Sequence, residues 1–239
     1  SVGEEEEEDS MERAFVSTLI QVILSPLKSK VTRQTAACYL ASFVSRADFC
    51  SAQTICQAVH TLLLVAEAYT QVAKDIKAAD AREQSTLHSL YYTITQAAFY
   101  IMCFRGNEAW KYYQVETQGD TTADTDIGPH RWEQLCSHEL NPLKYCLESV
   151  QFEFLKLADV YNLLTDDMRK KIFQTNNLDH AHQARKRKKR FVISTPATAE
   201  KERRKGGVGG LGQGSNPLES LFPFDPYLLR ESHSYIERI

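Results

Sequence analysis

Apolar residues recur every three or four positions in successive segments of this chain, and this periodicity restricts the fold to helical architectures. Residues with this spacing occupy one face of an α-helix. Each such face is stable only when another surface buries it, so the helices must pack together. The predicted helices span residues 11–27, 32–47, 51–79, 86–104, 131–139, 142–164 and 166–173.

Capping residues and prolines set the expected ends of these helices. Residues 9–10 offer side chains that can cap the first helix, and Pro26 ends or kinks it. Gly106 is expected to cap the carboxyl end of the helix over 86–104. Asn141 and Pro142 are expected to start a long helix, because Asn is a favoured N-cap and Pro fits the first helical position. Between these signals, residues 107–128 are predicted to form an exposed loop.

Successive amphipathic helices joined by short turns predict an all-α protein with a HEAT-like helical-repeat solenoid. An irregular helical bundle is the alternative, because the same apolar stripes would serve it equally well. The composition agrees, since 43% of the residues are apolar and the chain has only 10 Gly and 7 Pro. No apolar run approaches the roughly 18 residues that a membrane span needs, so no membrane association is expected.

Charge and composition divide the chain into four predicted segments. Residues 1–10 form an acidic linker, and residues 11–175 form the HEAT-like repeats. Apolar periodicity disappears between 176 and 215, where basic residues and glycines predict a disordered insertion. Residues 216–239 are expected to form an apolar strap and a short helix packed on the repeats. Outside the basic insertion the chain is net acidic, so direct DNA binding is not expected.

A run of six adjacent cations is the main candidate signal outside the repeats. Such a run stays extended and accessible, which favours a nuclear import signal over a phosphate-binding tail or a plain solvated segment. Nearby, Thr195 precedes Pro196 and is a candidate target for proline-directed phosphorylation, with an unmodified linker as the alternative. The run consists of Arg185, Lys186, Arg187, Lys188, Lys189 and Arg190.

Motifs that would point to an enzyme are missing from the sequence. It contains no Walker-type phosphate loop, no dinucleotide-binding fingerprint and no zinc-protease or nucleophile-elbow motif. The six cysteines include no C-x-x-C pair. We therefore expect no catalytic, cofactor-binding or metal-ligating residues and no small-molecule substrate.

Three strings, in order, resemble the TIF-IA family of RNA polymerase I-specific transcription initiation factors. They are residues 15–47, residues 140–144 (LNPLK) and residues 216–229 (NPLESLFPFDPYLL), and the acidic segment before the first string also fits. Residues 50–135 and 176–214 show no such match. The signature residues are Pro26, Leu27, Asn141, Pro142, Pro217, Phe222, Pro223, Phe224, Asp225 and Pro226.

The resemblance implies a HEAT-repeat adaptor without enzymatic activity that corresponds to a carboxyl-terminal portion of the family's factor. Members of the family bind RNA polymerase I and bridge it to promoter-bound core factor, the selectivity factor, for ribosomal RNA gene transcription. The expected location is the nucleus and nucleolus, with an import receptor bound to the basic run. The alternative is a HEAT-type nuclear scaffold or transport adaptor with a different protein cargo.

Overall fold

The computed structural model describes residues 2–73, 76, 78, 80–118 and 125–176. The described residues are helices joined by turns and loops, without a strand, so the predicted all-α class is confirmed for this part of the chain. They belong to two compact units, which divide between Leu164 and Thr165. Within the described residues, no helix is long and apolar enough to cross a bilayer.

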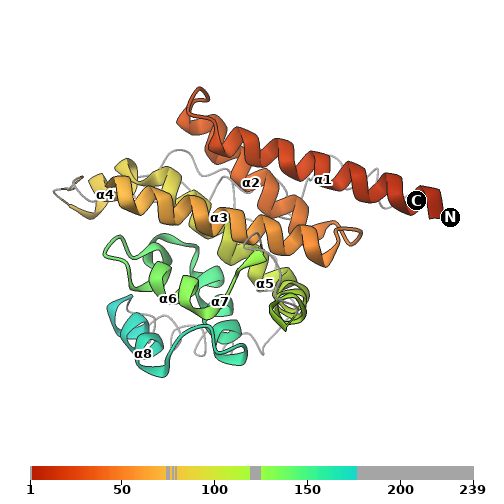
Figure 1. Cartoon of the computed structure of the whole chain (residues 1–239). Helices are drawn as coiled ribbons and strands as arrows, with labels where there is room; N and C mark the ends of the chain where they lie inside the picture. The colour runs from red at the N-terminus through yellow and green to blue at the C-terminus, as the bar shows by residue number, and fades with distance from the viewer. Residues whose placement is uncertain (1, 74–75, 77, 79, 119–124, 177–239) are drawn as a thin grey trace, which may run out of the picture. The chain divides into compact units, whose positions relative to one another are not determined.

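The first unit contains seven α-helices and one 3₁₀ helix among its described residues, and the second contains one α-helix (Figure 1). The helices of the first unit are α1 (Val2–Leu24), α2 (Lys30–Arg46), α3 (Ala52–Val72), α4 (Ala81–Leu87), α5 (Ser89–Gln118), α6 (Pro129–Ser137), the 3₁₀ helix η3 (Pro142–Tyr145) and α7 (Glu148–Val160). The helix of the second unit is α8 (Asp166–Thr175).

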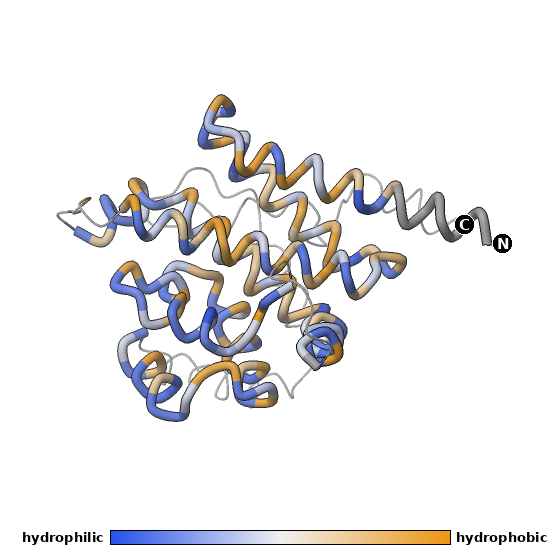
Figure 2. Tube along the Cα trace, in the orientation of Figure 1, coloured by the Kyte–Doolittle hydropathy of each residue, from blue (hydrophilic) through white to orange (hydrophobic). Residues whose placement is uncertain are grey.

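Helix α5 forms the centre of the first unit. It packs against α2 and α3 and also against α7, and every residue from His88 to Met102 is buried. Helices that are covered on all sides in this way belong to a core rather than to a surface. The other long helices keep one exposed face, and Figure 2 shows apolar and hydrophilic residues alternating along α2 and α3.

Aromatic rings join α5 to the two helices that follow it. The ring of Phe99 lies 4.4 Å from that of Phe154 and 5.8 Å from that of Trp132, measured between centroids. Trp132 and Phe154 are 5.2 Å apart. All three side chains are fully buried, and large aromatic side chains dominate the energy of such cores. This cluster therefore fixes α6 and α7 on α5.

Several helix ends differ from the sequence prediction. Helix α1 begins at Val2, so residues 2–10 are helical where a linker was predicted. It ends at Leu24, three residues before the predicted end, and Ser25-Pro26 ends the helix and does not kink it. Helix α3 ends at Val72 instead of 79. The loop predicted over 107–128 is wrong for residues 107–118, which continue α5.

Pro142 begins a helix as predicted, but that helix is the short η3 instead of one reaching residue 164. The chain leaves helical geometry at Cys146, and α7 begins only at Glu148. Here the side-chain oxygen of Gln96, from the buried part of α5, accepts a hydrogen bond of 2.8 Å from the backbone N–H of Leu147. The backbone N–H that the helix break exposes is therefore hydrogen-bonded to a core residue. Local sequence signals do not reveal this distant contact.

Gly106 lies inside α5 and does not cap it, so its predicted role is wrong. A Cβ atom at this position would lie 2.7 Å from the Cδ1 atom of Leu157, on α7. Carbon atoms pack at about 3.5–4.0 Å, so only glycine lets the two helices approach this closely without a shift. The second glycine with a close neighbour, Gly128, precedes α6 and faces the Tyr113 hydroxyl in the same way.

Replacing Gly106 with Val is expected to destabilise the first unit by about 2 kcal/mol, because the added carbons overpack the contact with Leu157. Urea unfolding followed by circular dichroism measures the change. The matched control is Gln114→Val at an exposed position of α5, where only helix propensity changes, by about 0.5 kcal/mol. Equal losses in the two variants would show that Gly106 is not needed for the approach of α7.

Candidate protein-interaction surface

The described cysteines are poor candidates for chemistry. Burial raises the pKa of Cys38, Cys50 and Cys56 to about 12, so these thiols stay protonated near neutral pH. A thiol, in contrast to a thiolate, is a weak nucleophile and a weak metal ligand. Within the described residues, no three His, Cys, Asp or Glu side chains are grouped so that they could hold a metal ion.

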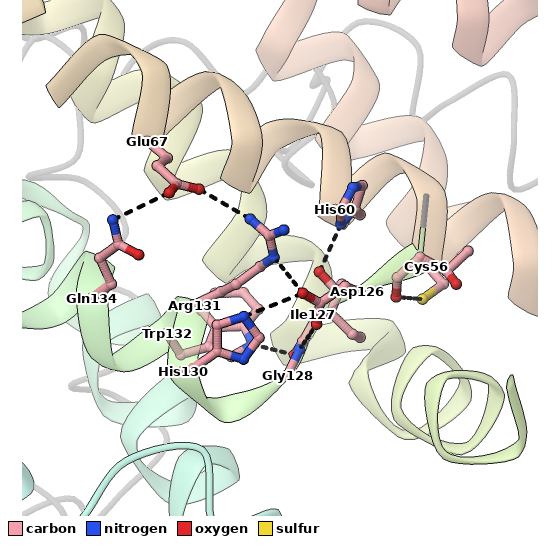
Figure 3. Close-up of polar contacts among 11 residues, drawn as sticks. Cys56, His60, Glu67, Asp126, Ile127, Gly128, His130, Arg131, Trp132 and Gln134 are labelled. Carbon is pink, nitrogen blue, oxygen red and sulfur yellow. Dashed lines mark hydrogen bonds and ion pairs between the residues drawn. The ribbon is translucent and has the colours of Figure 1, made fainter. Parts of the chain in front are cut away.

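A cluster of polar and charged side chains joins α3 to the start of α6 (Figure 3). Arg131 donates from Nε to Asp126 Oδ2 at 2.9 Å and from Nη1 to Glu67 Oε2 at 3.0 Å. Gln134 donates to the other oxygen of Glu67 at 3.3 Å. The guanidinium thus connects a carboxylate of the loop to one of α3, and we call this group the Arg131 clasp.

The backbone carbonyls beside the Arg131 clasp accept hydrogen bonds from side chains. His60 donates from Nδ1 to the carbonyl of Asp126 at 2.6 Å, and Cys56 donates to the carbonyl of Thr125 at 3.3 Å. The Trp132 indole donates to the carbonyl of Ile127 at 2.9 Å. These donors come from α3 and α6 and hold the backbone of residues 125–127 in place.

The carboxylate of Asp126 is kept ionised by its surroundings. Burial raises its pKa, but the N–H of Gly128 and the guanidinium of Arg131 outweigh burial and hold the pKa below its usual value. The cavity beside Glu67 and Arg131 has a volume of only about 20 Å³. A space of this size holds about one water molecule, so the Arg131 clasp is a structural contact and offers no substrate site.

An aromatic groove lies between α1, the end of α2 and the turn that follows α2. It has a volume of about 340 Å³ and is lined by Met11, Glu12, Phe15, Phe43 and Phe49. The rings of Phe15 and Phe43 pack edge to face, with centroids 4.7 Å apart, and Phe49 lies 5.9 Å beyond Phe43. Met11 is 71% exposed and Phe49 is 60% exposed.

Among the described residues that line the aromatic groove, the one charged residue is already bound. Glu12 is buried, and its carboxylate accepts hydrogen bonds from the hydroxyls of Ser51 and Thr54 at 2.8 and 2.7 Å. Burial raises the pKa of Glu12, but these bonds and the Ser51 N–H together lower it by more, so the pKa lies below its ordinary value. The groove therefore offers an apolar surface suited to the apolar side chains of a protein partner.

The four signature residues that the structure describes lie in two turns. Pro26 and Leu27 are in the exposed turn between α1 and α2, where Leu27 is 93% exposed. Asn141 has φ 43°, in the left-handed region, and its side chain caps η3 by accepting from the N–H of Lys144. Pro142 is buried at the start of η3. The first pair is a surface feature, whereas the second has a structural role.

The other predicted site residues lie outside the described residues. They are Arg185, Lys186, Arg187, Lys188, Lys189, Arg190, Thr195, Pro217, Phe222, Pro223, Phe224, Asp225 and Pro226.

Sequence reasoning missed the aromatic groove. The predicted core stripe of the first helix contains Val16, and Val16 is buried, but Phe15 is adjacent to it and faces a different direction. Phe15 is a large apolar residue outside the apolar stripe of its helix, and this is the signal that could have located the groove. Phe49 had no comparable signal, because it lies in a turn.

Comparisons with known proteins point to one family. A family model described as RNA polymerase I specific transcription initiation factor RRN3 matches residues 6–239. The chain is 26% identical over 230 residues to RNA polymerase I-specific transcription initiation factor rrn3 of Schizosaccharomyces pombe, and 26% identical over 226 residues to RRN3 of Mus musculus. The match also spans residues 50–135 and 176–214, where the sequence strings alone showed no resemblance.

Coverage of the relatives is partial, although coverage of the chain is nearly complete. The alignments include 93% and 95% of this chain but only 31% and 30% of the two relatives. The crystal structure of RNA polymerase I transcription initiation factor Rrn3 matches with a TM-score of 0.61 at 20% identity, covering 96% of this chain and 40% of that one. This likeness confirms the helical-repeat type of fold.

We expect acid to weaken the first unit through Asp126. Its pKa is lowered by folding, so its ionised form stabilises the fold above about pH 4, and this contribution is lost as the pH falls through the folded-state pKa. The free energy of unfolding should therefore fall from pH 5 to pH 3. Asp126→Asn should reduce stability at pH 7 by about 1 kcal/mol and make the acid dependence shallower.

Urea unfolding at a series of pH values measures both effects. The matched control is Glu139→Gln, which removes an exposed carboxylate and should change neither stability at pH 7 nor the acid dependence. If Asp126→Asn unfolds with the same pH dependence as the unaltered chain, the proposed role of the ionised carboxylate is wrong.

Proposed function

The chain belongs to the family of RNA polymerase I-specific transcription initiation factors described as RRN3, and from this premise we propose that it acts in transcription initiation by RNA polymerase I. In this proposal it is a non-enzymatic adaptor. It binds polymerase I and bridges the polymerase to promoter-bound core factor, so that ribosomal RNA genes are transcribed.

The observation that carries the proposal is the extent of the family match. The match spans residues 6–239, and the two relatives named above are themselves called RNA polymerase I-specific initiation factors. Because this chain aligns with only about a third of each relative, polymerase binding and core-factor binding are assigned to it as proposals.

The surface of the first unit supports an adaptor role. The aromatic groove exposes apolar rings from α1, from α2 and from the turn after α2. Soluble proteins seldom expose such patches without using them for binding, and paired helices offer shallow surfaces suited to protein partners. We propose that the groove binds the apolar face of a helix on another protein of the initiation complex.

The proposed site of action is the nucleus, and within it the nucleolus. The run from Arg185 to Arg190 is the proposed import signal, because six adjacent cations match the chemistry that import receptors recognise.

Polymerase binding is tested by co-purification from nuclear extract with the tagged 239-residue chain. We expect RNA polymerase I subunits to be recovered with it and to be identified by mass spectrometry. Phe49→Glu should reduce this recovery, because a charge enters the apolar groove, while the fold is kept because Phe49 is 60% exposed.

The matched control is Val160→Glu, which adds the same charge at a 70% exposed apolar position of α7. It should leave recovery unchanged. Recovery of a different protein set, without polymerase I, would favour a scaffold or transport adaptor and contradict the proposal. Equal recovery with Phe49→Glu and Val160→Glu would show that the polymerase binds elsewhere on the chain.

Deleting residues 185–190 is expected to abolish nuclear accumulation of a fluorescent fusion, because the cations that an import receptor would bind are removed. Fluorescence microscopy measures the nuclear to cytoplasmic ratio. The matched control replaces Arg203, Arg204 and Lys205 with Gln and should leave the ratio unchanged. Continued accumulation of the deletion variant in nuclei would refute the import assignment.

A further inference from the structure

The turn between α1 and α2 contains a serine in a distinctive sequence. Ser25 directly follows α1 and is succeeded by Pro26, Leu27 and Lys28. Proline-directed protein kinases of the cyclin-dependent class modify a Ser or Thr that precedes Pro, and they favour a basic residue three positions after the modified one. We propose that Ser25 is a phosphorylation site for such a kinase and that Arg33 binds the phosphate group.

The residues around Ser25 are exposed, and Ser25 itself is half-buried. Figure 1 shows it at the free end of the α1–α2 hairpin. Leu27 is 93% exposed, Leu24 is 50% exposed, and Pro26 and Lys28 are exposed as well. Ser25 is held in the turn by backbone hydrogen bonds to Gln21 and Lys28, of 3.0 and 3.3 Å. The end of a helix opens easily, so a kinase can bind this segment in an extended form.

The reaction at Ser25 is a simple phosphoryl transfer. The Ser25 Oγ atom attacks the γ-phosphorus of magnesium-bound ATP, and the bond from that phosphorus to the oxygen of ADP breaks as the new O–P bond forms. The hydroxyl proton passes to the catalytic base of the kinase. The products are ADP and a phosphoserine with nearly two negative charges at neutral pH.

A guanidinium is bound at the end of α1, close in sequence to Ser25. Arg33, from the first turn of α2, donates from Nε to the carbonyl of Ile23 at 2.6 Å. This bond holds the guanidinium at the carboxyl end of α1, two residues before Ser25. The terminal nitrogens of a guanidinium form a fork that matches phosphate oxygens.

Two lysines in or next to this turn carry positive charge. Lys28 lies within it, and Lys30 begins α2, where it donates to the carbonyl of Thr86 at 3.2 Å. The negative end of the α1 dipole opposes a phosphate here, but that effect is weak in solvent. Charge-assisted bonds from Arg33 are stronger, so the phosphate is expected to be held.

The chain contains one other Ser/Thr-Pro pair, Thr195-Pro196, and it differs in a useful way. The third residue after Thr195 is Thr198, not a basic residue. The two sites therefore provide an internal comparison, in which only Ser25 has the favoured basic residue.

The first test incubates the purified 239-residue chain with a cyclin-dependent kinase and magnesium ATP, and maps the products by mass spectrometry. We expect phosphate on Ser25, at a rate that Lys28→Ala lowers several-fold while the rate at Thr195 is unchanged. Ser25→Ala should remove only the turn phosphopeptide. Absence of phosphate from Ser25 under conditions that modify a standard substrate peptide would overturn the proposal.

The second test measures whether Arg33 binds the phosphate, by ³¹P NMR titration of the phosphorylated chain. The second pKa of a phosphoserine is about 6. We expect it to be lower by ~0.5 or more than in a phosphopeptide of residues 20–30, which contains both lysines but lacks Arg33. Arg33→Gln should bring the value back toward that of the peptide, and Arg33→Lys should give an intermediate value.

Two controls make the second test decisive. Arg13→Gln removes one cation from α1 at roughly 18 Å along the helix from Ser25 and should leave the phosphate pKa unchanged. Circular dichroism checks that each variant is folded. Equal phosphate pKa values in the folded chain and in the peptide would show that Arg33 does not hold the phosphate.

Discussion

The turn between α2 and α3 is held from both sides by buried charges, and the arrangement of the first unit depends on it. Arg105, on α5, donates to the carbonyls of Ala47 and Cys50 at 2.8 and 3.1 Å. Glu12, on α1, accepts from the N–H and the hydroxyl of Ser51. A buried charge is tolerated only when it is hydrogen-bonded, and here the turn supplies part of those bonds, with Thr54 and Glu108 supplying others. Helices α1 and α5 are thereby fixed to the same five-residue turn.

The same interactions shape the aromatic groove. Glu12 lines it, and the turn that Glu12 binds contains Phe49. Glu108 forms an ion pair with Arg105, and this hydrogen-bonded pair raises the pKa of Arg105 above its ordinary value. The guanidinium therefore stays charged and keeps hold of the turn. The exposed aromatic groove is in this way supported by contacts that solvent hardly reaches, because Glu12 and Arg105 are 2% and 8% exposed.

Local signals predicted most helices, and long-range contacts account for the errors. The stripes of α1 and α2 and a helix end near Pro26 were visible in the sequence, since helical spacing and proline act within a few residues. The role of Gly106 was not visible in the sequence, because it depends on Leu157, some fifty residues away. For the same reason the sequence could not show that Arg105 binds the turn after α2. The Arg131 clasp likewise joins residues that only the fold brings together.

The aromatic groove and the Ser25 turn lie on one hairpin but act at different places. Phe15 and Ser25 are ten residues apart along α1, which is about 15 Å of helix. Exposed charges are screened within about 8 Å at physiological ionic strength, so a phosphate at Ser25 has little direct effect on the groove. It would alter binding only of a partner that also covers the turn. A single hairpin thus offers two separable surfaces, one apolar and constant, the other charged and changeable by modification.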